Sequence, residues 1–196
     1  GEITMNKNVK RLGVFALAGV LGLGVASTTI SAAEPSKDTD VFYTTSSTNI
    51  DADGKVVMVV PAAVSLTKEN KTQEFAVTIQ TADETETLPD NFAATVKVES
   101  KNKGMLKDKG MTKSFAYKLL KGEAVGGSEI TLTGQDVEFH NFTAQKGTSS
   151  VEQKATIKVE DEVVKKLENE KPGSRFTDTL TFKVTSLSGD GLTQVK

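Results

Sequence analysis

Hydrophobic and polar residues alternate along most of the chain after Asp40, the pattern of strands that bury one face. The clearest cases are residues 74–80 and 92–100, where apolar side chains occupy every second position. Residues 55–60 (KVVMVV) are nearly all apolar and stop at Pro61. We therefore expect a strand there that is buried on both faces.

Further strands are expected where the alternation returns between turn residues. They are predicted at residues 41–45, 62–66, 114–121, 130–132, 136–142, 152–160 and 175–185. In the last of these, Asp178 falls on the apolar face, and we place it at the strand's edge or at a bulge. The Asp53-Gly54 pair between two predicted strands favours a hairpin turn.

The hydrophobic period changes after residue 160. Val163, Val164 and Leu167 follow a helical spacing, Asp161 is placed to cap, and a Pro-Gly pair follows. These features predict one short helix over residues 161–169. Short strands with turns at regular intervals and one helix predict an all-β, Ig-like antiparallel β-sandwich; a closed barrel is the alternative.

An apolar run without charges, residues 12–26, follows three cationic residues. Its 15 residues fall short of the roughly 20 that a helix needs to span a bilayer. Small residues end the stretch, so we predict a helical signal peptide over residues 1–33, cleaved between Ala33 and Glu34. An uncleaved membrane anchor is the alternative.

The signal peptide divides the chain. Residues 1–4 precede Met5, where a signal of this kind begins, so they are upstream or added residues. We expect the sandwich domain over residues 34–185 and a flexible tail over residues 186–196.

Composition limits the class of protein. The chain has no cysteine, and small secreted eukaryotic domains usually carry disulfides. Export without cysteine therefore favours a Gram-positive bacterial origin. A domain of about 150 residues buries enough surface to fold without such bonds.

The charge of the chain limits the kinds of partner that it can bind. The net charge is −2, and Arg175 is the only arginine after residue 33. A nucleic-acid partner would need a basic, arginine-rich patch, so we exclude one. No second apolar run follows, so no membrane contact is predicted after signal cleavage. The lysine-rich residues 101–113 are either a solvated loop or a contact for anionic wall polymer.

A weak calcium candidate lies in the predicted hairpin turn. Asn49, Asp51 and Asp53, followed by Gly54, match the first half of a calcium-binding loop. The twelfth position should be Glu but is Val60. A plain hairpin turn is the alternative, and no other cofactor is predicted.

Catalytic chemistry has little support in the sequence. His140 is the only histidine, and no GxSxG nucleophile motif is present. The carboxylate clusters at residues 83–86 and 160–162 are typical of any acidic surface. We predict no catalytic residues and no enzyme; a hydrolase that uses paired carboxylates, or His140 beside a serine, is the remaining alternative.

Two segments carry a resemblance. Residues 56–66 read VVMVVPAAVSL, and residues 172–184 read PGSRFTDTLTFKV. Both resemble secreted Gram-positive surface proteins, similar to pilin-like and WxL-associated β-sandwich proteins. The resemblance implies an Ig-like sandwich that acts in adhesion or assembly at the cell surface. The chain differs from that group in having no LPxTG sequence and no Trp, and no functional residues carry over.

Together these observations predict a non-enzymatic, exported protein, extracellular or at the cell surface, with a structural or adhesive role. Its expected partners are wall or host-surface components, or further copies of itself through strand addition. Residues 34–48 would then pair within their own domain or with a neighbouring subunit. The alternative function is a secreted binding protein for a small ligand or Ca²⁺.

Overall fold

The computed structural model describes residues 38–43 and 47–195, with the backbone alone for residues 38–43. The predicted signal peptide and its cleavage site between Ala33 and Glu34 lie outside the described residues. The described residues belong to one compact unit. In the described part of the chain, no helix is long and apolar enough to cross a membrane.

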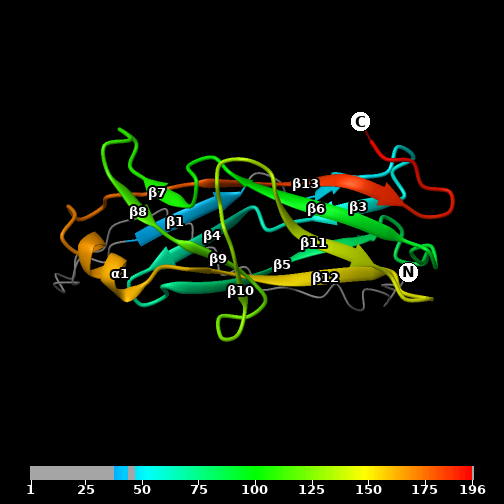
Figure 1. Ribbon diagram of the computed structural model, residues 1–196, viewed down its shortest axis with the longest axis horizontal. Helices are drawn as coiled ribbons and strands as arrows, with labels where there is room; N and C mark the ends of the chain where they lie inside the picture. Colours follow the sequence, from blue (N-terminus) through cyan, green and yellow to red (C-terminus); the bar gives the residue numbers. More distant parts are fainter. Residues whose placement is uncertain (1–37, 44–46, 196) are drawn as a thin grey trace, which may run out of the picture. The chain divides into compact units, whose positions relative to one another are not determined.

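The described residues form two main β-sheets, which confirms the predicted all-β sandwich with one short helix (Figure 1). In spatial order, sheet A contains β11 (Val137–Thr143), β6 (Ala93–Ser100), β13 (Thr179–Ser188), β1 (Asp38–Tyr43) and β4 (Ala63–Thr67). Sheet B contains β10 (Ser128–Ile130), β9 (Lys118–Lys121), β12 (Ser150–Lys158), β5 (Thr72–Thr81), β3 (Val56–Val59) and β2 (Ser47–Asn49).

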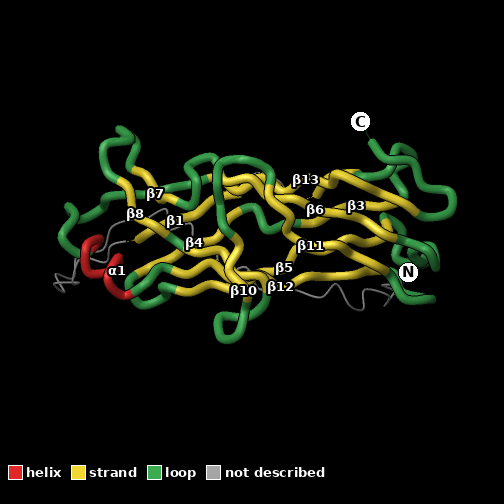
Figure 2. Tube along the Cα trace, in the orientation of Figure 1, coloured by secondary structure: helices red, strands yellow, loops and turns green. Residues whose placement is uncertain are grey.

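A small hairpin and the helix complete the described structure. The hairpin pairs β7 (Met105–Lys107) with β8 (Ser114–Ala116), and the helix is α1 (Asp161–Leu167). Helix α1 packs against β8, at the end of the sandwich where Figure 2 shows the helix in red.

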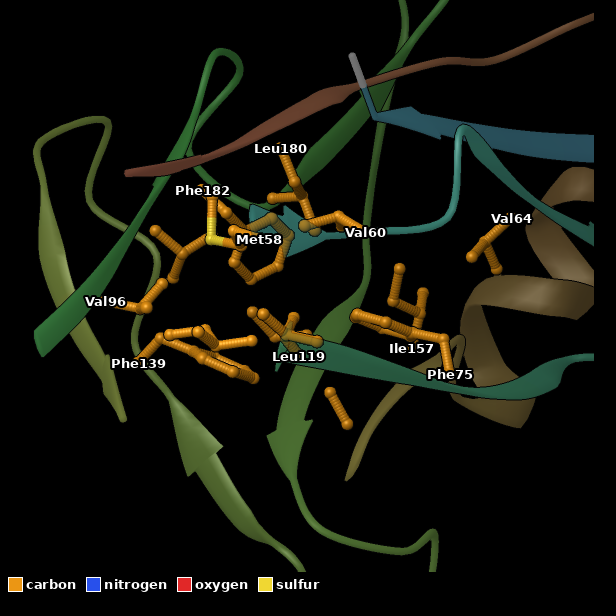
Figure 3. Close-up of a cluster of buried hydrophobic side chains, with 14 of the residues drawn as sticks. Met58, Val60, Val64, Phe75, Val96, Leu119, Phe139, Ile157, Leu180 and Phe182 are labelled. Carbon is orange, nitrogen blue, oxygen red and sulfur yellow. The ribbon is translucent and has the colours of Figure 1, made fainter. Parts of the chain in front are cut away.

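The core lies between the two sheets because their alternating strands turn apolar side chains toward each other. Strands β5 and β6 show the alternation directly, with every second residue buried along most of their length. Phe182 of sheet A meets Phe75 of sheet B edge-to-face at 6.2 Å and Phe139 of its own sheet at 5.1 Å (Figure 3). Each such buried ring stabilises the fold by about 1.5–3 kcal/mol.

Strands β1 to β4 form two antiparallel pairs, one in each sheet, and the chain changes sheet between β3 and β4. In sheet A, β1 pairs with β4 from Asp38↔Thr67 to Phe42↔Ala63. In sheet B, β2 pairs with β3. Pro61 lies between β3 and β4, where the chain passes from sheet B to sheet A. Its missing N–H therefore breaks no ladder hydrogen bond. The predicted turn at Asp53-Gly54 is present, with Gly54 at a φ of 72°.

Four local predictions are wrong. The single strand expected over residues 114–121 is divided at Tyr117 into β8, which pairs with β7, and β9, which lies in sheet B. Strand β3 is not buried on both faces, because it lies next to the edge strand β2 and leaves Val57 and Val59 half-buried. Residues 101–110, expected as a loop, contain β7. Helix α1 ends at Leu167, and its N-cap is Glu160, without a side-chain capping bond, instead of Asp161.

The structure also differs from the expected flexible tail. Strand β13 continues to Ser188, and the next residues are bonded to the domain. Asp190 and Asn91 bond each other twice, at 2.9 and 3.0 Å. The N–H of Ala52 also donates a hydrogen bond to the C=O of Thr193, at 2.7 Å. Residues 189–195, here called the C-terminal segment, therefore belong to the sandwich.

Candidate functional site

Strand β1 occupies the interior of sheet A although it is the first strand of the described chain. It pairs with β4 at five registered positions. On its other side it runs parallel to β13 and pairs only at Phe42↔Thr179 and Tyr43↔Leu180. Among the described strands, β4 has no other sheet neighbour than β1, so β1 holds β4 in sheet A.

The position of β1 defines a slot between β4 and β13. A strand is the group that fits such a slot, because the facing strand edges present backbone N–H and C=O groups that need partners. The prediction for residues 34–48 left two destinations open. The structure places residues 38–43 in the slot of their own chain.

The predicted calcium loop is a hairpin turn that binds the C-terminal segment. The Asp51 side chain is 1% exposed. One of its oxygens accepts a hydrogen bond from the N–H of Thr193 at 2.8 Å, and the other accepts one from the N–H of Lys55 at 3.2 Å. The bond from Thr193, more than the others, holds the pKa of Asp51 below its ordinary value of 3.8, against the effect of burial.

The other two calcium candidates are on the surface. Asp53 forms an exposed ion pair with Lys55 at 3.0 Å, and Asn49 lies exposed in β2. Across residues 47–195, no group of three or more His, Cys, Asp or Glu side chains could hold a metal ion. The loop thus has a structural task, which is to anchor the chain after β13.

The C-terminal segment contacts the turn between β2 and β3 on one side and β13 on the other. Its Gln194 side chain donates to the C=O of Val184 in β13, at 3.1 Å. The N–H of Val195 donates a hydrogen bond to the C=O of Ile50, at 3.2 Å. The segment therefore joins the end of sheet A to the loop that follows β2.

His140 lies at a shallow groove between β11 and β12. The groove has a volume of about 300 Å³, and its lining is mostly polar: His140, Asn141, Phe142, Thr143, Gln145, Thr148, Val151 and Glu152. The imidazole stands edge-on to Phe142 at 4.7 Å. Partial burial, and then the charge of Lys121, lower its pKa below 6.5. The residues that line this groove include no serine.

The two carboxylate clusters are occupied by local contacts. Asp83 accepts hydrogen bonds from the N–H and the hydroxyl of Thr85, at 2.8 and 2.7 Å. Glu160 forms an ion pair with Lys158 at 3.2 Å, and Asp161 forms one with Lys71. Exposed pairs of this kind contribute little to stability.

A buried carboxylate is the feature that the sequence pattern identified only in part. Asp178 is 2% exposed and accepts four hydrogen bonds. The hydroxyls of Ser100 and Tyr117 donate to one oxygen at 2.6 and 2.7 Å. The N–H groups of Asn102 and Thr179 donate to the other at 2.9 and 2.7 Å. The network joins the end of β6, the link between β8 and β9, and the start of β13.

Comparison with known proteins assigns no family to this chain. No protein-family model matches the chain, and a search among curated proteins gives no match.

Proposed function

We propose that this protein is a non-enzymatic, exported β-sandwich with a structural or adhesive role outside the cell, and that its copies join by exchanging the N-terminal strand. The observation that supports the proposal is the place of β1. A strand from the start of the chain fills an interior position of sheet A, so the sheet can be completed by its own β1 or by that of another copy.

Exchange would replace each contact of β1 by the same contact in a second copy, which makes strand swapping a low-cost route to association. The slot binds its own β1 at an effective concentration of roughly millimolar. Exchange between copies therefore requires a high local concentration. A cell surface that is crowded with the protein would supply that condition.

Cysteine crosslinking tests the exchange. The chain has no cysteine of its own, so every disulfide that forms must involve an introduced cysteine. Asp40 and Ser65 are paired across β1 and β4. The Asp40→Cys and Ser65→Cys chains are made separately, secreted from a Gram-positive host, mixed at high concentration and oxidised. We expect a disulfide-linked heterodimer, since these two positions meet between chains only when β1 is exchanged.

The control uses Gln80→Cys and Ser150→Cys, which pair across β5 and β12 in the interior of sheet B. These chains should stay unlinked under the same conditions. Equal heterodimer yields from both mixtures, or none from the first at any concentration, would overturn strand exchange. Binding of the wild-type protein to washed cell walls then tests the adhesive role separately.

A further inference from the structure

The hairpin of β7 and β8 carries a rigid tip, residues 108–113. Its base is fixed to the domain by two backbone bonds between Lys107 and Thr177, at 2.9 and 2.8 Å. Leu106 is fully buried, and Phe115 meets Phe176 edge-to-face at 4.8 Å. The tip is therefore held in place by the core at one end of the sandwich (Figure 1).

The turn itself is built around Asp108. Its carboxylate accepts hydrogen bonds from the N–H of Lys113 at 2.7 Å and the hydroxyl of Thr112 at 2.9 Å. Its backbone C=O accepts the N–H of Met111 at 2.9 Å. These bonds place Met111 at a φ of 56°, a conformation that side chains other than Gly, Asn and Asp rarely adopt.

Met111 is 58% exposed, so its side chain adds little to the core. Glycine would suit the backbone better and would lose little buried apolar surface. Folding therefore does not explain methionine at this position. The other exposed large hydrophobic residues of the described chain are Val195, at 47%, and Val125, at 91%. Val125 lies in the turn between β9 and β10, where the charged residue nearest in sequence is Glu123.

Cations surround the exposed methionine. Lys107, Lys109 and Lys113 lie within four residues of Met111. Lys113 is paired with Glu170. For Lys107 and Lys109 the described residues provide no ion pair. With Asp108 counted against Lys107 and Lys109, this end of the hairpin presents an exposed apolar side chain and a net charge of +1.

We infer that this tip docks onto an anionic lipid surface. Lysine ammonium groups meet the phosphates of the headgroups, and the methionine enters the boundary between headgroups and acyl chains. The methionine favours lipid over a soluble phosphate polymer, because a hydrated polymer offers no apolar phase to receive it. The inference is independent of strand exchange, because β1 takes no part in the tip.

Vesicle sedimentation tests the inference with the chain as secreted from a Gram-positive host. The probes are vesicles of equal parts phosphatidylglycerol and phosphatidylcholine, and vesicles of phosphatidylcholine alone. We expect binding to the anionic vesicles only, with release as salt is raised and screens the charges. Comparing variants of one secreted form removes any contribution from the N-terminal segment.

The variants distinguish the contribution of charge to vesicle binding from that of the apolar contact, and both from an effect on folding. The Lys107→Gln/Lys109→Gln double variant should bind about 25-fold more weakly, at about fivefold per lysine. Met111→Gly should bind about tenfold more weakly while it unfolds at the same or a higher temperature. Val125→Gly, the matched control, should bind as the wild type does.

Three results would overturn the inference. The first is no binding to the anionic vesicles. The second is an equal loss of binding in Met111→Gly and Val125→Gly. The third is binding to soluble polyglycerol phosphate that competes fully with the vesicles and does not depend on Met111, which would assign the tip to a phosphate polymer.

Discussion

Replacing Asp178 by asparagine tests whether the buried carboxylate network holds the sandwich together. The substitution keeps size and shape but replaces the oxygen that accepts from Ser100 and Tyr117 with an NH₂ group, which cannot accept. The two bonds from backbone N–H groups survive on the amide oxygen. The change is therefore confined to two hydroxyl donors.

The expected cost follows from those two bonds. A hydrogen bond to a charged group contributes about 1.5–3 kcal/mol, and both hydroxyls can partly recover by turning to accept from the new amide. We expect Asp178→Asn to lower the free energy of unfolding by about 3 kcal/mol, or Tm by about 6–12 °C. Tyr117→Phe, which removes one donor, should cost about half as much.

Far-UV circular dichroism during urea and thermal unfolding measures the effect. The matched control is Asp83→Asn, because Asp83 also accepts from one hydroxyl and one N–H but is exposed, and we expect it to destabilise the protein much less than Asp178→Asn does. If Asp178→Asn and Asp83→Asn destabilised the protein equally, or if Tyr117→Phe were as stable as the wild type, our account of the network would be refuted.

Three further outcomes follow from the structure. Because the folded pKa of Asp51 is depressed, its contribution to stability is complete above pH 3.8 and is lost as pH falls through the folded pKa; Asp51→Asn should flatten this part of the stability curve in acid urea titrations. Gly127→Ala should destabilise more than Gly126→Ala in the same assay, since a Cβ at Gly127 would lie 2.5 Å from a backbone oxygen whereas Gly126 faces open space and costs only its positive φ of 84°. The NMR titration midpoint of His140 should lie below 6.5 and rise in Lys121→Gln, which removes a lowering charge; an unchanged midpoint would leave burial as the only cause.

Local pattern predicted the strands well where one face meets the core. The strands predicted at residues 74–80 and 92–100 match β5 and β6 to within a few residues. Such strands can be predicted because the alternation of buried and exposed side chains involves consecutive residues. Strand β7 was missed because three residues with one buried side chain, Leu106, are too short to show a period. The change of sheet between β3 and β4 was also missed, since Val64 and Leu66 alternate in sheet A as Val56 and Met58 do in sheet B.

The sites depended on contacts that local pattern does not contain. Asp51 looked like a metal ligand because its spacing from Asn49, Asp53 and Gly54 matches half of a calcium-binding loop, yet its main partner is Thr193, 142 residues away. Asp178 was placed on the apolar face of its strand, but its hydroxyl partners come from β6 and from the link after β8. Such pairings arise from the fold and could be recognised only after the strands had been ordered.

The parallel contact between β1 and β13 has a mechanical consequence. The first and last strands run side by side in the same direction, so a force that pulls the two ends of the domain apart slides one strand along the other. Sliding loads all bonds of the contact together, whereas peeling breaks them one at a time. The contact is only two registered pairs long, so under tension β1 should separate from β13 before the longer β6–β13 ladder gives way. If copies exchange strands as we propose, tension would open the domain first along one side of the slot.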